Sequence, residues 1–220
     1  MCSEKVLVDT CFLHKISNDA KDICNLKKIL DNFKKEPFVH PYVAQHELSL
    51  NSNLQRLIDD GYIQVVKYEE LFKKDYVKNM YKGFFETLYT DLRKTLESDH
   101  SEKAHKMYKS LDEVDIFQDH KQGSSLADVH MMLLAYFMKM PIVLTEDSDI
   151  QILRDIANRR LQFNGQELII YDALDVVKQI ASDPSVPVTS KDLEDMLNVM
   201  KERSHRTEIK QIWKDSRNAD

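Results

Sequence analysis

Glycine, proline and cysteine are scarce in this chain, and each shortage excludes a class of protein. The 220 residues include 4 Gly and 5 Pro, which argues against linkers, low-complexity segments and all-β architectures. The glycines are not clustered, so the sequence lacks the glycine-rich phosphate loop of nucleotide-binding proteins. The cysteines, Cys2, Cys11 and Cys24, are odd in number and show no CxxC or Cys/His metal spacing. We therefore expect reduced thiols, as in the cytoplasm.

Long apolar runs and an excess of positive charge are lacking too. No apolar run approaches the roughly 18 residues that a membrane helix needs, and the opening residues MCSEKVLVD show no signal-peptide pattern. A net charge of −6 does not indicate nucleic-acid binding, which usually shows as a basic surplus. The hydrophobic content of 42% and the length fit one globular domain, which we expect to be cytoplasmic with no membrane partner.

Short apolar runs alternate with helical patterns along the chain. The predicted strands lie at residues 5–9, 62–68, 141–145 and 167–172, with a further extended segment at 38–43. The predicted helices lie at 23–33, 44–61, 124–140, 149–160 and 173–181. Gly61 is expected to end the second of these helices, and Ser124 or Ser125 to cap the third. This alternation predicts an α/β protein with a mostly parallel sheet.

Two segments extend this plan. Residues 66–120 are polar, helical in pattern and without a catalytic motif, and they could lengthen a groove, shield a site or form a dimer interface. A final helix is predicted to start near Thr189, where Asp192 completes a capping-box spacing. We therefore divide the chain into a domain of residues 1–182, with 66–120 as a helical insertion, and a C-terminal helical extension, 183–220.

Acidic side chains are placed to meet at one edge of the predicted sheet. Asp9 ends the first strand and Asp147 follows the strand at 141–145. Because the functional crevice of a parallel sheet lies outside the carboxyl ends of its strands, both acids should reach it. Asp128 lies in the first turn of a helix that is apolar nearly all round, and Glu47 lies early in its helix.

Four carboxylates at one edge repel one another, and some stay protonated unless a cation is present. An all-oxygen cluster suits Mg²⁺ or Mn²⁺, and the scattered histidines complete no zinc site. One or two such ions could hold a phosphodiester and activate a water. Each acid also has a possible structural role. Asp9 could form a strand-end turn, and Asp128 could interact favourably with the dipole of its helix. Glu47 could be a solvated side chain, and Asp147 or Asp149 could cap the helix that follows.

The order of these motifs resembles the PIN domain family of metal-dependent ribonucleases. The matching stretches are VLVDT with Asp9, HEL with Glu47, SSLADVHMMLLAYF with Asp128, and PIVLTEDSD with Asp147 and Asp149. The resemblance implies a three-layer α/β/α fold and Mg²⁺- or Mn²⁺-dependent cleavage of RNA. Many bacterial relatives are toxins of toxin–antitoxin pairs, so the resemblance also implies an inhibitory protein partner or a homodimer as a possibility.

The resemblance also implies roles for individual residues. Metal coordination and catalysis fall to Asp9, Glu47, Asp128 and Asp147, with Asp149 as an additional acidic member. Thr10 and Thr145 would orient the carboxylates by hydrogen bonds. Glu146 departs from the pattern, because it adds negative charge where a phosphate should approach unless its side chain faces away.

Basic side chains near the site could bind RNA despite the net negative charge of the chain. The candidates are Lys15, Lys121 and Arg154 within the domain, with Arg203, Arg206, Lys210, Lys214 and Arg217 in the tail. The tail could instead dock on a second subunit or an inhibitor, or form a solvated helix with a frayed end.

Two other functions compete with the ribonuclease. The first is a PIN-like module that binds RNA or protein without cutting. The second is another Mg²⁺-dependent phosphohydrolase on a parallel sheet. The haloacid-dehalogenase type would need Asp-x-Asp after the first strand, whereas this chain has Asp9, Thr10 and Cys11 there.

Overall fold

A parallel sheet forms the centre of the protein. The computed structural model describes residues 4–17, 23–161 and 167–218. Five strands lie in the order β3-β2-β1-β4-β5, and every pair is parallel, which confirms the α/β fold with a parallel sheet. The strands are β1 (Lys5–Val8), β2 (Glu36–Val39), β3 (Gln64–Val65), β4 (Ile142–Leu144) and β5 (Ile169–Tyr171).

Strand β1 is buried on both faces. Its residue Leu7 pairs with Phe38 on one side and Val143 on the other. Val6, Leu7 and Val8 are all fully buried. A strand covered on both faces needs apolar side chains at every position, which explains the uninterrupted run VLV in the sequence.

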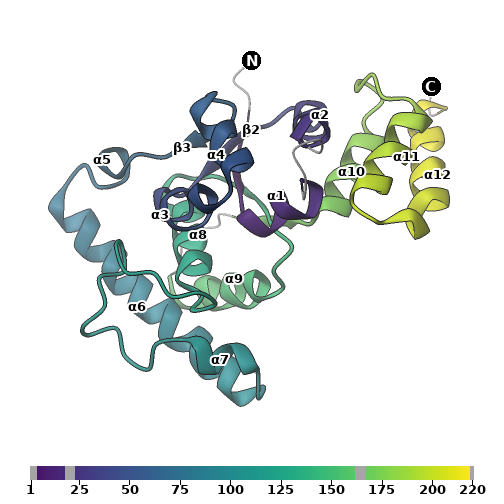
Figure 1. Cartoon of the computed structure of the whole chain (residues 1–220). Helices are drawn as coiled ribbons and strands as arrows, with labels where there is room; N and C mark the ends of the chain where they lie inside the picture. Colours follow the sequence, from purple (N-terminus) through teal and green to yellow (C-terminus); the bar gives the residue numbers. More distant parts are fainter. Residues whose placement is uncertain (1–3, 18–22, 162–166, 219–220) are drawn as a thin grey trace.

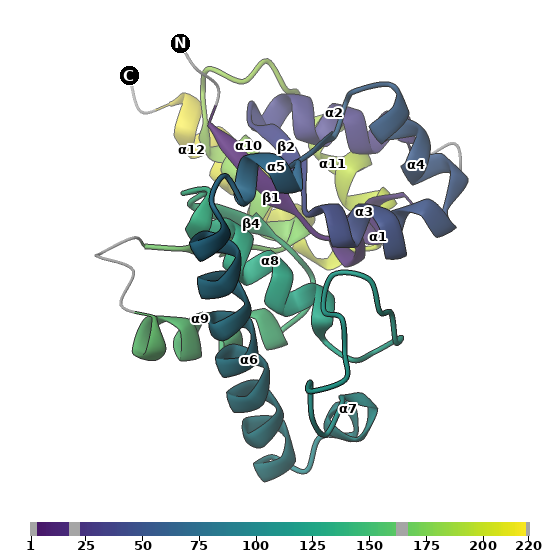
Figure 2. The ribbon, with the colours of Figure 1, turned by 90° about the vertical axis from the view of Figure 1, so that its left-hand side faces the viewer.

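Helices cover the sheet on both sides. One group of mutually contacting helices consists of α1 (Thr10–Ile16), α2 (Ile23–Phe33) and α10 (Ala173–Ser182). The other consists of α6 (Asp75–Ser98), α8 (Leu126–Phe137) and α9 (Asp149–Arg160). In Figure 2 strands β1 and β4 lie between α2 on one side and α8 and α9 on the other. The arrangement is consistent with a three-layer α/β/α fold.

Among the described residues, no helix is long and apolar enough to cross a membrane.

The single helix predicted for residues 44–61 is wrong, because the chain is broken in its middle. The structure has α3 (Pro41–His46), the 3-10 turn η1 (Leu48–Leu50) and α4 (Ser52–Asp59). The side chain of Asn51 accepts hydrogen bonds from the backbone N–H of Asn53 and Leu54, so it starts a new helix there. Gly61 follows the end of α4 with φ +69, as expected of a glycine at a helix end.

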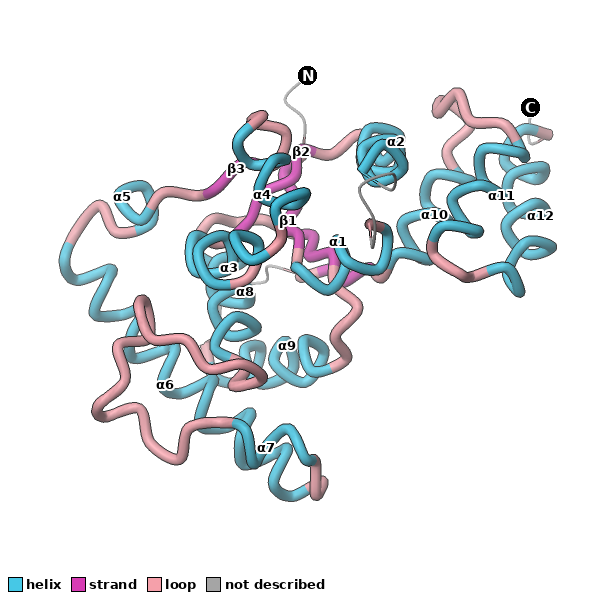
Figure 3. Tube along the Cα trace, viewed as in Figure 1, coloured by secondary structure: helices cyan, strands magenta, loops and turns pink. Residues whose placement is uncertain are grey.

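The insertion is helical only in its first part. It contains α5 (Tyr68–Leu71), the long α6 and, beyond its far end, α7 (Glu102–Lys106). Residues 107–125 form turns rather than the predicted helix, and they return along the insertion as an irregular loop (Figure 3). Asp115 and Asp119 explain this, because their side chains accept hydrogen bonds from nearby backbone N–H groups and so compete with helix formation.

The C-terminal extension packs against the domain. It consists of α11 (Ser190–Val199), the 3-10 turn η2 (Arg203–His205) and α12 (Arg206–Arg217), which lie beside α10 at one end of the molecule (Figure 1). The capping box of Thr189 and Asp192 is present as predicted. Ile209 of α12 is 1% exposed, and Nε1 of Trp213 donates to the carbonyl of Val188 at 3.0 Å. The described part of the tail therefore packs against the domain through one face, and the very end of the chain, for which fraying was expected, lies outside the described residues.

Candidate functional site

The site forms where β1 and β4 end side by side. Val8 pairs with Leu144 at the last position of both strands, and the backbone N–H of Asp9 donates to the carbonyl of Leu144 at 2.9 Å. From β1 the sheet continues through β2 and β3 in one direction and through β4 and β5 in the other. This is the point of an open parallel sheet at which a crevice forms at the carboxyl ends of the strands.

Asp9 is buried and held by three donors. Its Oδ1 accepts from the backbone N–H of Thr10 at 2.7 Å, and its Oδ2 accepts from Oγ1 of Thr145 at 2.7 Å. Sγ of Cys11 also donates to Oδ2, at 2.7 Å. Burial raises the pKa of Asp9, and these hydrogen bonds oppose the rise. Asp9 thus caps α1, a role that the sequence analysis did not predict, and lines the cavity at the same time.

Cys11 contributes to the site although the sequence suggested no role for it. Besides its bond to Asp9, its sulfur lies 3.2 Å from Oγ1 of Thr145 and accepts from the backbone N–H of Glu146 at 3.1 Å. Burial and the neighbouring Asp9 raise the pKa of the thiol, so it stays protonated and donates. Its function in this position is to fix the carboxylate, and no spacing rule would have found it.

Thr145 links the two strand ends. Its hydroxyl donates to Asp9 and accepts from the backbone N–H of Asp147 at 3.1 Å. Asp147 in turn accepts from the backbone N–H of Asp149 at 2.9 Å through Oδ1, which caps the start of α9. The hydroxyl therefore orients two of the candidate ligands, in the position expected of it.

Lys103 joins three of the carboxylates. Its Nζ lies 3.2 Å from Oδ2 of Asp128, 2.7 Å from Oδ2 of Asp147 and 2.7 Å from Oδ2 of Asp149. Burial disfavours the charged ammonium, but the three acids outweigh that effect, so the pKa of Lys103 is raised. The lysine comes from α7 of the insertion, from which the sequence led us to expect no chemistry.

Asp128 and Glu47 lie at the same cavity as Asp9. Burial raises the pKa of Glu47 to about 7, and Asp9 and Asp128 add to the effect. Burial also raises the pKa of Asp128, while Lys103 opposes the rise. Ser125 stands at the N-cap position of α8, but the expected capping bond from its side chain is not formed. The four principal acids predicted from the sequence are thus brought together.

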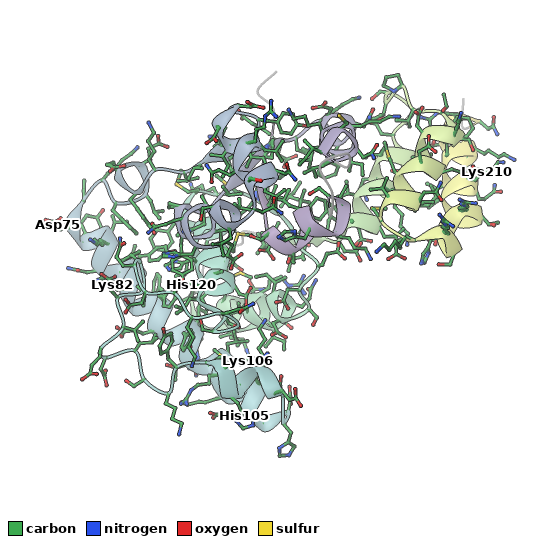
Figure 4. The ribbon with its side chains drawn as sticks, in the orientation of Figure 1. Asp75, Lys82, His105, Lys106, His120 and Lys210 are labelled. Carbon is green, nitrogen blue, oxygen red and sulfur yellow. The ribbon has the colours of Figure 1, made fainter. Side chains whose placement is uncertain are left out.

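These acids line one end of a cavity of about 690 Å³, and aromatic and imidazole rings line another part. The rings of His46 and His120 are stacked with an interplanar angle of 2° and centroids 5.3 Å apart. Tyr42 lies against His46 at 4.5 Å between ring centroids. His120 belongs to the loop that precedes α8 (Figure 4). The cavity therefore combines negative charge at the strand ends with flat ring surfaces beside it.

Of the three basic residues of the domain that were predicted to bind RNA, one lines the cavity and two do not. Lys121 lines the cavity, with Nζ 4.9 Å from the centroid of the Tyr108 ring. Lys15 instead forms a salt bridge with Glu202 at 2.6 Å, and Arg154 lies 3.5 Å from Asp155. Neither Lys15 nor Arg154 lines the cavity.

Glu146 and Arg217, whose charges the sequence analysis considered, make contacts away from the cavity. Oε1 of Glu146 accepts from the backbone N–H of Ala173 at 2.8 Å, at the start of α10. Its charge therefore interacts with a helix N-terminus, and the side chain does not line the cavity. In the tail, Arg217 donates to the carbonyl groups of Ala181 and Val186 at 3.1 and 2.9 Å.

The donor set fits a hard divalent cation in its chemistry. Within the described ranges no group of three or more His, Cys, Asp or Glu side chains has the spacing of a metal site. Three carboxylates nevertheless converge on one cation, the ammonium of Lys103, and a single lysine cannot balance all the acids gathered there. Oxygen ligands with excess negative charge are what Mg²⁺ and Mn²⁺ prefer.

Comparison of the chain with protein-family models, with curated proteins and with solved structures finds no match in any of the three.

Proposed function

We propose that the protein is a divalent-metal-dependent endoribonuclease of the PIN type, which hydrolyses RNA phosphodiester bonds. The observation that carries the proposal is that Asp9 and Asp147, after the carboxyl ends of β1 and β4, line one cavity together with Asp128 of α8 and Glu47. The order of these acids in the sequence supports the same function by its resemblance to PIN domains.

Each residue has a role that follows from its contacts. Asp9, Glu47, Asp128 and Asp147 would hold Mg²⁺ or Mn²⁺, with Asp149 beside them. Thr145 and the backbone of Thr10 hold Asp9 in one orientation. When bound, the ion supplies a water of lowered pKa and stabilises the charge that develops on the phosphate and leaving oxygen.

The ring surfaces of the cavity support RNA as the substrate. Single-stranded RNA is commonly recognised by stacking of its unpaired bases on aromatic or histidine rings. The exposed ring of His120, stacked on His46, offers such a surface at the same cavity as the acids, and Lys121 adds a positive charge there.

Cleavage assays test the proposal. Purified protein is incubated with mixed cellular RNA in Mn²⁺, in Mg²⁺ and in EDTA, with Asp128→Asn in parallel. Asp195→Asn, which removes the same charge from an exposed position on α11, is the matched control. We expect fragments only with metal, from the wild type and the control. Because water is the nucleophile, the products should carry no 2′,3′-cyclic phosphate.

A module that binds RNA without cutting it is the second candidate. The observation that favours it is the set of salt bridges from Lys103 to Asp128, Asp147 and Asp149, which a silent site could keep permanently. Retention of RNA on the protein in EDTA, with no fragments in any metal, would support this second function and contradict the first.

A further inference from the structure

Lys103 is a cation that the fold itself brings into the acidic site. It lies on α7, beyond the long helix α6, and its Nζ is within 3.2 Å of oxygen atoms from three carboxylates. An ammonium group has three N–H donors. Three acceptors therefore use all of them, and none remains for a phosphate. Lys103 is thus a positioning residue rather than a group that contacts substrate.

The segment that carries Lys103 is anchored. Ala104, next to the lysine on α7, is 6% exposed, and Met107, directly after the helix, is 3% exposed, so two apolar side chains that follow Lys103 are buried. The hydroxyl of Tyr89 on α6 accepts from the backbone N–H of Tyr108 at 2.6 Å, and Ser101 caps α7 through the backbone N–H of Lys103. These contacts hold the segment that carries Lys103 in place, so its ammonium group is a fixed part of the site.

Lys103 forms salt bridges with three of the five acids of the site and with neither of the other two. Asp128, Asp147 and Asp149 form salt bridges with it. No lysine or arginine of the described residues forms a salt bridge with Asp9 or Glu47. Asp9 and Glu47 are therefore the two acids of the site without a salt bridge, whereas the other three share the single positive charge of Lys103.

We infer that Lys103 takes the place of a second divalent ion, so that the site holds one ion, at Asp9, Glu47 and Asp128, rather than two. The inference rests on the proposed function, because that function supplies the metal. In a site with a pair of ions, the ions lie about 4 Å apart and share carboxylates. Here the ammonium occupies the position among Asp128, Asp147 and Asp149 that a second ion would need.

Counting bound Mn²⁺ by calorimetric titration and by electron paramagnetic resonance tests the inference. The wild type is compared with Lys103→Met, which keeps most of the side-chain volume and removes the charge. Lys106→Met is the matched control, because this lysine is exposed on the same helix (Figure 4) and forms no salt bridge with the described residues. Lys103→Arg keeps the positive charge.

We expect one ion in the wild type, in Lys106→Met and in Lys103→Arg, and a second ion in Lys103→Met. Two ions in the wild type would overturn the inference whether or not any variant folds. A wild type that binds no ion would also overturn the inference. So would a single bound ion in both the wild type and Lys103→Met, because the substitution should open a second site. The count does not depend on cleavage: one bound ion without RNA cleavage would contradict the proposed function and leave the inference standing.

Discussion

Oγ1 of Thr145 donates a hydrogen bond to Oδ2 of Asp9 at 2.7 Å, although 136 residues separate the two along the chain. The same hydroxyl accepts from the backbone N–H of Asp147, so one side chain fixes the acids at the ends of two strands. The position of these acids is therefore determined by the β1–β4 pairing and by one buried hydroxyl.

Thr145→Val removes that hydroxyl while keeping the shape of the side chain. We expect a loss of about 1–3 kcal/mol in the free energy of unfolding, because buried partners lose their hydrogen bonds. RNA cleavage should fall as well. Urea denaturation and initial rates are the measurements, with Thr87→Val as the control. Thr87 is exposed on α6 and bonds to the carbonyl of Gly83, so its change should stay within about 0.5 kcal/mol. An equal effect of the two substitutions would contradict the role of Thr145.

Glu47 should make stability depend on pH in metal-free buffer. Burial raises its pKa from 4.5 to about 7, so the folded state holds a proton that the unfolded state releases. The free energy of unfolding therefore falls as pH rises from about 4.5 through about 7. Glu47→Gln should remove on the order of 2 kcal/mol of that fall. Urea denaturation from pH 4 to 8 measures it, and parallel pH profiles for wild type and variant would contradict the assignment.

Lys103→Met should destabilise the metal-free protein. Three partly buried carboxylates lose their common cation, which we expect to cost about 2–3 kcal/mol. Divalent ions should restore much of this loss, because they replace the missing charge. Thermal unfolding with and without Mg²⁺ measures both effects, and Lys106→Met should behave as the wild type does. A variant that is as stable as the wild type without metal would show that the three salt bridges contribute nothing.

The C-terminal helix α12 should unfold together with the domain. Ile209→Ala should cost about 2–4 kcal/mol, because its side chain is buried between α12 and its neighbours. The adjacent Lys210→Ala changes an exposed position on the same helix (Figure 4) and should cost little. Circular dichroism and tryptophan fluorescence, which reports Trp213 on α12, should show one common transition. Two separate transitions would show that residues 183–218 unfold independently of the sheet domain.

The acids at the strand ends were predictable from the sequence because a short apolar run is enough to identify a buried strand and the residue that follows it. A short apolar run followed by Asp9, and another followed by Asp147, define strand ends that a parallel sheet must bring to one edge. The buried helix α8 placed Asp128 for the same reason, since an apolar surface all round forces its first turn inward. In the structure Asp9, Asp128 and Asp147 line the same cavity, as these sequence patterns predicted.

Lys103 and Cys11 could not be found in this way. A lysine in a polar, mixed-charge segment has no pattern that separates it from solvated lysines, and two of its three partners lie 25 and 44 residues away along the chain. Cys11 shows no metal spacing, and its bond to Asp9 depends on the turn that starts α1. The break at Asn51 was missed because a capping residue can interrupt a pattern that otherwise continues with helical periodicity.

The initial rate of cleavage of a single-stranded RNA, measured as Mn²⁺ is added to metal-free protein, tests the central claim most directly. We expect a saturable rise from zero for the wild type and a rate at least about 100-fold lower for Asp128→Asn, since loss of a metal ligand removes the activated water. Cleavage that does not depend on Mn²⁺, or equal rates for the wild type and Asp128→Asn, would contradict a carboxylate-held metal as the basis of the activity.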